Sequence, residues 1–481
     1  MEYISTRNNK KIFTFEEVFL KGLASDGGLF IPKSLKKFTI DELESFRNLN
    51  YQDLIKKIIF PYLGDFISKN EFSDIIKKSY SVFRKNNVVH LSKDPNNVLE
   101  INILELFHGP TLAFKDVAMQ LIGNFYEYYL NKNNKQINII VATSGDTGAA
   151  AIDAIKGKKN INIFVLHPHN KISTVQRKIM TTVKEKNVFN LAIKGNFDNC
   201  QNLVKHLFSD QNFSNSINMS GVNSINWARI IAQTVYYFYA YFQSKYVKDS
   251  LYEKPINFSI PTGNFGDAYA GYLAKKMGLP IDKLIIATND NDILHRAISE
   301  GNYEVKKVLQ TLSPSMDIQV ASNFERLIYD LNNFNDTSTE KVMSEIKKTG
   351  KYKFSKDIIE KIKKDFVSAS LSIEEMKNII IKLSDNPNSV IVDPHTAIGL
   401  GAIIKVTNEN KHSKINTVNT ISLATAHPAK FPEATKFAKG GVELPNELKY
   451  VMKEKENFNI MDNNIQQVKD YIIKKIQTKS E

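Results

Sequence analysis

Residues 137–149 read Ile-Asn-Ile-Ile-Val-Ala-Thr-Ser-Gly-Asp-Thr-Gly-Ala, an apolar run that passes through a polar turn into an alanine-rich segment. A continuous apolar run of this length predicts a buried strand, and the segment after the turn predicts a helix. Strand-like runs return at 161–166 and 188–193, with a helical pattern at 175–183 between them. Buried strands that alternate with helices are typical of a parallel, doubly wound sheet, so the predicted fold class is α/β.

The same alternation returns in the C-terminal half of the chain. Further strands are predicted at 256–260, 284–287, 389–392 and 420–424. The pattern divides the chain into three predicted domains: a mostly helical N-terminal domain (1–95), an α/β domain (96–254), and a second α/β domain (255–481) with a helical insertion near 300–385.

Composition excludes several classes of protein. The 481 residues carry a formal net charge of +13, which raises the question of a nucleic-acid partner. The lysines are scattered and form no recognisable nucleic-acid module, so we expect no nucleic-acid partner. Cys200 is the single cysteine, so no intrachain disulfide is expected.

The most apolar long segment does not resemble a membrane span. Residues 225–242 are interrupted by Arg229 and Gln233, which favours a buried helix. The first twenty residues carry Glu16 and Glu17 and lack an apolar core, so a signal peptide is not expected. We therefore expect no membrane contact and a cytoplasmic location.

A lysine begins a predicted helix in the stretch His108 to Asp116. The residues after Lys115 are apolar at helical spacing, so one face of this helix should be buried. A buried lysine is costly unless it is paired, deprotonated or used covalently. The alternative is a lysine whose stem lies on the core while its ammonium group reaches water, and this stretch alone favours that alternative.

Three loops at predicted strand ends carry polar groups. The loop Gly263 to Asp267 has two glycines at the start of a helix, where converging amides suit a phosphate dianion; a plain strand-to-helix turn is the alternative. The loop Ser144 to Gly148 adds two hydroxyl groups and suits a carboxylate or another phosphate. The stretch Thr425 to Lys430 offers a hydroxyl, an imidazole and a cation.

Together these features indicate pyridoxal phosphate, which needs a lysine, a phosphate-binding turn and a partner for its ring nitrogen. The loop at 263–267 has neither the dinucleotide nor the Walker spacing. The pair His167 and His169 lacks a third ligand at a useful spacing, so no metal site is expected.

At these residues the sequence resembles the threonine synthase family, within the fold type II (tryptophan-synthase-β-like) group of pyridoxal-phosphate enzymes. The stretches that carry the resemblance are 25–32, 108–116, 143–148, 261–267 and 425–431. The most specific are Gly-Pro-Thr-Leu-Ala-Phe-Lys-Asp and Thr-Ala-His-Pro-Ala-Lys-Phe. The resemblance implies two doubly wound, mostly parallel sheets that face an inter-domain cleft, preceded by an N-terminal helical region.

The resemblance also implies roles for individual residues. Lys115 would form the Schiff base with the cofactor, and Thr425 would face the pyridine nitrogen. The cofactor phosphate would be held by Gly263, Asn264, Phe265 and Gly266, with Asp267 beside them. The substrate carboxylate would be received by Ser144, Gly145, Asp146 and Thr147. The candidates for the substrate phosphate are His108, Thr111, Arg229, Arg296 and Lys430.

The activity that the resemblance implies is the conversion of O-phospho-L-homoserine and water to L-threonine and phosphate, the last step of threonine biosynthesis. The enzyme would be a monomer or homodimer. Two alternatives stay open from the residues: a related phospholyase that releases a 2-oxoacid, and a basic binding protein, for example for RNA, that keeps the fold without catalysis.

Overall fold

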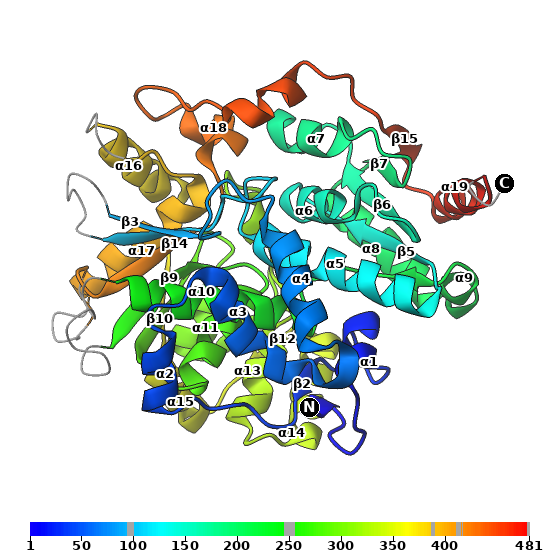
Figure 1. The fold of residues 1–481 in the computed structure, drawn as a ribbon. Coiled ribbons are helices and arrows are strands. Elements are labelled where there is room, and N and C mark those ends of the chain that lie inside the picture. Colours follow the sequence, from blue (N-terminus) through cyan, green and yellow to red (C-terminus); the bar gives the residue numbers. More distant parts are fainter. Residues whose placement is uncertain (94–100, 245–254, 386–389, 410–414, 416, 479–481) are drawn as a thin grey trace. The chain divides into compact units, whose positions relative to one another are not determined.

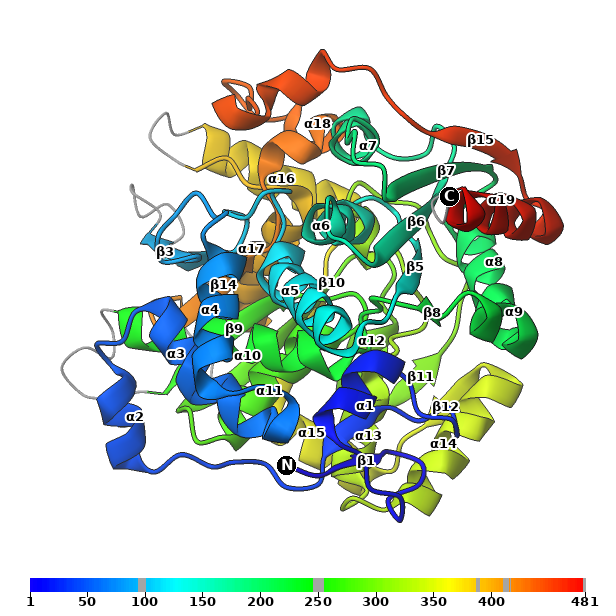
Figure 2. The same cartoon turned by 45° about the vertical axis from the view of Figure 1, so that its right-hand side comes forward.

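Two β-sheets organise the chain, one in each of two compact units (Figure 1 and Figure 2). The first unit comprises Met1–His108 and Ser224–Val442, and the second comprises Gly109–Asn223 and Glu443–Glu481. The computed structural model describes residues 1–93, 101–244, 255–385, 390–409, 415 and 417–478. Each unit is built from two separate stretches of chain, whereas the three domains predicted from the sequence are contiguous. The three-domain division stays a prediction.

The first unit contains a six-stranded sheet that is parallel except at one edge. Its strands, in spatial order, are β13 (Phe366–Ser370), β10 (Ile281–Thr288), β9 (Ile256–Pro261), β14 (Thr420–Ala424), β4 (Asn102–Glu105) and β3 (His90–Lys93). The central strands β9 and β14 are buried along their whole length. Burial of both faces explains why these strands are continuous apolar runs rather than alternating ones.

Helices connect these strands and contribute most of the remaining core of the first unit. They are α10 (Trp227–Gln243), α11 (Gly266–Lys276), α12 (Ile293–Glu300), α13 (Phe324–Leu331), α14 (Asp336–Thr349), α15 (Lys356–Asp365), α16 (Ile373–Ser384), α17 (Pro394–Glu409) and α18 (Pro432–Thr435). Helix α10 packs along α11, and α17 packs against β9, β10 and β14. The carboxyl ends of β9 and β14 therefore feed directly into the loops at 262–265 and 425–427.

The N-terminal region of the first unit is mostly helical, as predicted. Its elements are β1 (Tyr3–Ser5), α1 (Phe15–Lys21), β2 (Phe30–Pro32), α2 (Ile40–Phe46), α3 (Tyr51–Ile59) and α4 (Lys69–Tyr80). The capping box expected from the sequence is present at Thr14, whose hydroxyl accepts from the amide of Glu17.

The segment 300–385 was predicted to be helical, and the structure corrects this. Besides four helices it contains β11 (Asn302–Glu304) and β12 (Lys351–Lys353), which pair with each other, and β13, which lies parallel to β10 in the main sheet. The strand predicted at 389–392 is also wrong for its described part: residues 390–392 form no strand and lead into α17, and residue 389 lies outside the described residues.

The second unit contains a fully parallel five-stranded sheet. Its strands, in spatial order, are β15 (Asn459–Asp462), β7 (Val188–Lys194), β6 (Ile161–Pro168), β5 (Ile137–Ala142) and β8 (Met219–Ser220). Its helices are α5 (Lys115–Asn133), α6 (Asp146–Ile155), α7 (Thr174–Thr181), α8 (Phe197–Ser209), α9 (Gln211–Ser216) and α19 (Ile465–Gln477). Figure 2 shows β15 and α19, from the C-terminal end of the chain, beside β7 and α8.

Helix α10 is buried over nearly its whole surface, as its sequence predicted. Its polar residues Arg229 and Gln233 are buried with it. Within the described residues, none of the helices has both the length and the apolar character that a membrane crossing requires.

Helix α19 offers a direct test of how the C-terminal stretch stabilises the second unit. Ile472 is fully buried in the core cluster beside β7 and α8, whereas its neighbour Ile473 is 36% exposed. We expect Ile472→Ala to lower the free energy of unfolding by about 2–4 kcal/mol because it leaves a cavity. Ile473→Ala is the matched control and should cost less than about 1 kcal/mol. Equal losses in chemical unfolding would contradict the assignment of α19 to this core.

Candidate active site

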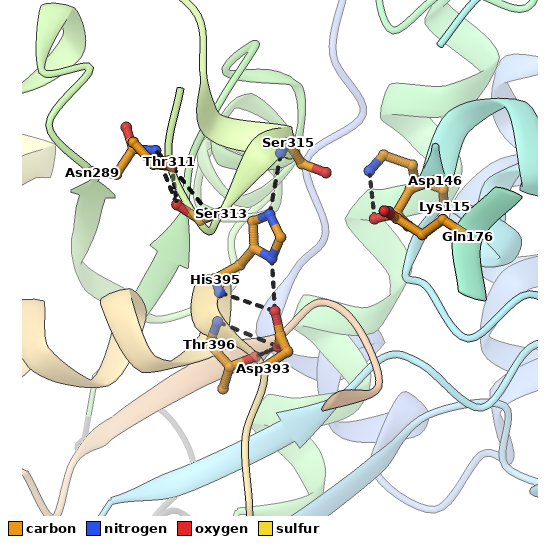
Figure 3. Close-up of polar contacts among 10 residues, drawn as sticks. All are labelled: Lys115, Asp146, Gln176, Asn289, Thr311, Ser313, Ser315, Asp393, His395 and Thr396. Atoms are coloured by element: carbon orange, nitrogen blue, oxygen red, sulfur yellow. Dashed lines mark hydrogen bonds and ion pairs between the residues drawn. The ribbon is translucent and has the colours of Figure 1, made fainter. Parts of the chain in front are cut away.

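Lys115 is the first residue of α5, as predicted, and its side chain is buried. Its Nζ lies 3.4 Å from Oδ2 of Asp146, a carboxylate that is itself buried (Figure 3). The Nζ also lies 5.0 Å from the ring centroid of Phe114. A buried amine is stabilised by a buried opposite charge, and an aromatic face adds a weaker attraction. The solvated alternative for Lys115 is therefore wrong.

The loop before Lys115 is closed by its own hydrogen bonds. The buried carboxylate of Asp116 accepts from the amide of Thr111 at 2.8 Å and from the Thr111 hydroxyl at 2.6 Å. A Cβ atom added to Gly109 would collide with the Asp116 side chain, so glycine is required there. Leu112 adopts a positive φ of 62° within the same loop. This loop fixes where α5 begins and hence where the amine of Lys115 lies.

The turn after β5 is built around Thr143 and the start of α6. The Thr143 hydroxyl accepts from the amides of Gly145 at 2.9 Å and Gly148 at 2.8 Å. The Nε2 of Gln176, from α7, donates to Oδ1 of Asp146 at 2.8 Å. Asp146 is therefore held between Gln176 and Lys115 through its two carboxylate oxygens. Ser144 and Thr147, in the same turn, are partly exposed.

The turn between β9 and α11 has the geometry of an anion site. Phe265 adopts φ 61° at the N-cap of α11, and no side chain caps this helix. A left-handed residue at this position turns consecutive amides toward one side, and an uncapped helix start favours a negative charge. The carbonyl of Asn264 accepts from the amide and side chain of Asn323 at 3.1 and 3.0 Å, which fixes the outer side of the turn.

Asp267, predicted beside this turn, bonds to side chains of α10. Its Oδ1 accepts from the hydroxyl groups of Tyr236 and Tyr237 on α10, the latter at 2.8 Å. Arg229 is buried on the same helix, and its Nε and Nη1 have no hydrogen-bond partner among the described residues. Burial lowers the pKa of Arg229 to about 10, while Tyr236 and Asp267 oppose that shift. These contacts tie α11 to α10.

A cluster of cationic and imidazole groups gathers at the loop after β14. Burial lowers the pKa of His427 to about 4, and the nearby side chains of Arg84, His108 and Lys430 lower it further. His427 Nδ1 accepts from the amide of Ala429 at 3.2 Å, so the neutral ring carries its proton on Nε2. Four groups that favour an anion therefore lie near one another in the first unit.

Thr425 and His108 follow the carboxyl ends of two adjacent parallel strands, β14 and β4. Thr425 is buried directly after β14, and β4, its neighbour in the sheet, leads through Phe107 to His108. Nε2 of His108 lies 2.8 Å from Oε2 of Glu105. A hydroxyl group and the cation cluster thus follow neighbouring parallel strands.

Arg296 is engaged elsewhere in the first unit. Its Nε donates to Asp292 at 2.8 Å and its Nη2 donates to the carbonyl of Glu304 at 2.8 Å. The first bond lies within the start of α12, and the second holds α12 to β11. Two of its three guanidinium nitrogens are bonded in this way, and Nη1 has no hydrogen-bond partner among the described residues.

The fold and these groups define a pyridoxal-phosphate-dependent enzyme of fold type II. The residues fit the cofactor: the second unit has a buried primary amine, and the first has an uncapped helix start and a hydroxyl group at adjacent strand ends. The comparisons agree, because the family model for pyridoxal-phosphate-dependent enzymes matches residues 91–349.

The flanking parts of the chain identify the family. The models for the threonine synthase N terminus and the threonine synthase C-terminal region match residues 2–80 and 396–472. The chain is 44% identical to threonine synthase of Saccharomyces cerevisiae, over 96% of this chain and 95% of that protein. It is 42% identical to threonine synthase of Pseudomonas aeruginosa, over 98% of each.

A solved structure gives the same result. The crystal structure of PLP-bound threonine synthase from Brucella melitensis matches with a TM-score of 0.91 and 42% identity, over 99% of both chains. The chain belongs to the threonine synthase family.

Two contributors to the site were missed from the sequence. Gln176 lies on the buried side of α7 and bonds to Asp146, but nothing in its local sequence points to a site. Arg84 lies between α4 and β3, in the N-terminal region, where the sequence analysis named no site residue. Its Nη2 donates to the carbonyl of Phe107 at 2.5 Å, a contact that only the sheet pairing of β3 with β4 makes available.

The low pKa of His427 predicts sensitivity to acid. An unfolded histidine takes up a proton near pH 6.5, whereas folded His427 stays neutral down to about pH 4. Between these values the unfolded state binds more protons, so the free energy of unfolding falls as the pH falls, by at most about 1.4 kcal/mol per pH unit. His427→Gln should remove this part of the slope in chemical unfolding measured across that range. An unchanged slope would contradict the assigned pKa.

Proposed function

We propose that the protein is a threonine synthase that converts O-phospho-L-homoserine and water to L-threonine and phosphate, the last step of threonine biosynthesis. The observation that carries the proposal is the buried amine of Lys115 against Asp146, within a sequence that aligns over almost its full length with threonine synthases. We further propose a cytoplasmic enzyme that is a monomer or homodimer.

Bound pyridoxal phosphate supplies an electron sink that stabilises negative charge on the amino-acid carbons next to it. Lys115 holds the cofactor as a Schiff base through Nζ, and, once released, the same amine takes the Cα proton of the substrate. The Nζ passes this proton on and takes a Cβ proton as phosphate leaves from Cγ. A proton returned to Cγ makes the methyl group of threonine, water adds its hydroxyl group at Cβ and gives up its other proton, and the Nζ returns a proton to Cα. A flexible side chain on a fixed helix start suits these successive transfers.

The first unit binds the phosphate of the cofactor in this proposal. The residues assigned to it are Gly263, Asn264, Phe265 and Gly266, whose amides converge at the uncapped start of α11. Thr425 faces the ring nitrogen through its hydroxyl group. Asp267 positions α11 through the tyrosines of α10 and does not touch the phosphate.

The substrate carboxylate binds at the turn Ser144 to Thr147. The carboxylate of Asp146 is occupied by Lys115 and Gln176 and would repel a second carboxylate. The turn therefore contributes the hydroxyl groups of Ser144 and Thr147 and its backbone, including Gly145, while the side chain of Asp146 holds the amine in place.

The substrate phosphate binds at the cation cluster, which comprises Arg84, His108, His427 and Lys430. The low pKa of His427 supports this assignment, because a neutral imidazole surrounded by cations is ready to donate to an anion. Among the other candidates from the sequence, Thr111 bonds to Asp116 and Arg296 to Asp292, while the buried Arg229 is influenced only by the charges of Tyr236 and Asp267. We assign all three structural roles.

Product analysis tests the proposed activity against the phospholyase. The lysine and the anion-binding turns serve either reaction, so only the products separate them. Incubation with O-phospho-L-homoserine should release phosphate and L-threonine in equal amounts. Phosphate accompanied by ammonia and 2-oxobutyrate, without threonine, would overturn the proposal in favour of the phospholyase. Absence of bound cofactor and of turnover would favour a non-catalytic binding protein.

Lys115→Ala should abolish turnover and the visible absorbance of the bound cofactor, because no other amine replaces Nζ at the start of α5. Helix content by circular dichroism should be retained. The matched control is Lys132→Ala, an exposed lysine on the same helix, which should keep activity. Substantial turnover by Lys115→Ala would remove this residue from the mechanism.

Lys430→Gln should raise KM for O-phospho-L-homoserine by about ten- to a hundredfold, the usual effect of losing a charged hydrogen bond. The affinity for the cofactor should stay near that of the wild type, because a different turn binds it. Lys436→Gln, which changes a more exposed lysine paired with Glu433, is the control. An unchanged KM in Lys430→Gln would exclude the cation cluster as the substrate phosphate site.

A further inference from the structure

The segment 311–317 of the first unit packs directly against the turn that follows β9. A Cβ atom built on Gly263 would lie 2.5 Å from the carbonyl oxygen of Ser315, so only glycine fits between them. Ser315 belongs to a short 3-10 turn, Pro314–Met316. The position of this turn therefore decides where the backbone of Gly263 lies.

A buried Asp–His pair holds this turn in place. The amide of Ser315 donates to Nε2 of His395 at 3.2 Å, and Nδ1 of His395 lies 2.7 Å from Oδ1 of Asp393 (Figure 3). Because Nε2 accepts a hydrogen bond, Nδ1 carries the proton and donates to the carboxylate. Asp393 and His395 are 0% and 2% exposed. The pair thus links a backbone amide to a carboxylate without access to water.

Asp393 is itself anchored to a rigid element. It precedes α17, where its carboxylate accepts from the amide of His395 at 2.9 Å and from the amide and hydroxyl group of Thr396. Helix α17 packs against β9, β10 and β14. Through His395, Asp393 and α17, the position of Ser315 is therefore fixed relative to the central strands of the sheet.

A second set of bonds fixes both ends of the segment. Asp317 accepts from the amide of Thr311 at 2.8 Å and from its hydroxyl group at 2.6 Å. Asn289, which follows β10, donates to Asp317 at 2.8 Å and to the hydroxyl group of Ser313 at 2.9 Å. The ends of the segment are closed in this way, and the bond from Ser315 to His395 joins its middle to the start of α17.

We propose that Asp393 and His395 are positioning residues for the cofactor phosphate: through Ser315 they hold Gly263, and hence the amides of the turn 263–266, in the geometry that binds the dianion. The inference rests on the proposed assignment of that turn to the phosphate. It gives a role to part of the segment 300–385, for which the sequence indicated none. Neither residue touches the cofactor.

Two polar substitutions at His395 separate its two bonds. The short amide of His395→Asn occupies the Nδ1 position, so it keeps the contact with Asp393 and loses the acceptor for Ser315. The longer amide of His395→Gln places an acceptor near the Nε2 position. The first variant therefore breaks the proposed link, and the second retains it.

The measurement is the affinity of the apo-protein for pyridoxal phosphate and for pyridoxal, which lacks the phosphate. We expect His395→Asn to weaken pyridoxal phosphate binding about tenfold and to leave pyridoxal binding unchanged, since only the phosphate contribution is lost. His395→Gln should stay within about threefold of the wild type for both ligands. Thr407→Val, on the same helix, removes a hydroxyl group that has no hydrogen-bond partner among the described residues and is the control.

Each outcome decides the inference. Equal losses for pyridoxal phosphate and pyridoxal in His395→Asn, which a general folding defect would also produce, would overturn it, as would an unchanged preference for the phosphorylated form. Failure of the proposed function would look different, because the wild-type protein would then show no preference for pyridoxal phosphate or form no threonine.

Discussion

The ion pair between Lys115 and Asp146 is the interaction on which the second unit depends. An amine that is removed from water needs a nearby negative charge, and the Asp146 carboxylate at 3.4 Å supplies it. The carboxylate must in turn be held, which Gln176 does from α7. The Thr111 and Asp116 bonds fix the start of α5 on the other side. The amine is therefore positioned by α5, α6 and α7, three helices that connect strands of the same sheet in the second unit.

The helices of this chain begin either with or without a capping side chain. Helices α1, α2, α4 and α16 begin with complete capping boxes, which satisfy their first amides internally. Helix α11 has no side-chain cap, and neither do α5, α12 and α13. Amides without such a cap cost stability unless another group satisfies them. At α11, where Phe265 also has a positive φ, we interpret the uncapped start as the position where the cofactor phosphate takes the place of a capping side chain.

Much of the fold could be predicted because its central strands are buried on both faces. The predicted strands at 137–142 and 420–424 coincide with β5 and β14, and those at 161–166 and 256–260 differ from β6 and β9 only at one end. Short or polar edge strands could not be predicted. Strand β15, Asn-Ile-Met-Asp, is mostly exposed, and its place beside β7 depends on pairing across more than 250 residues of sequence.

Some residues of the candidate site could also be predicted from the sequence, and others could not. Lys115 and the glycines at 263 and 266 could be found because their local sequence is unusual, with a lysine at an apolar helix start and two glycines after a strand. Gln176 and Arg84 act through partners that are 30 and 23 residues away in the chain, and their sequence neighbours are ordinary. The spacing of residue types along the sequence does not predict such contacts, because they form only when strand pairing brings two loops of the same unit together.

The central claim is that the amine at the start of α5 is the one that holds the cofactor. The direct measurement is reduction of the purified holoenzyme with sodium borohydride, which makes the bond to the lysine irreversible, followed by mass spectrometry of its peptides. We predict that the phosphopyridoxyl group is found on Lys115. Its presence on another lysine, or on none while the protein forms threonine, would contradict the account.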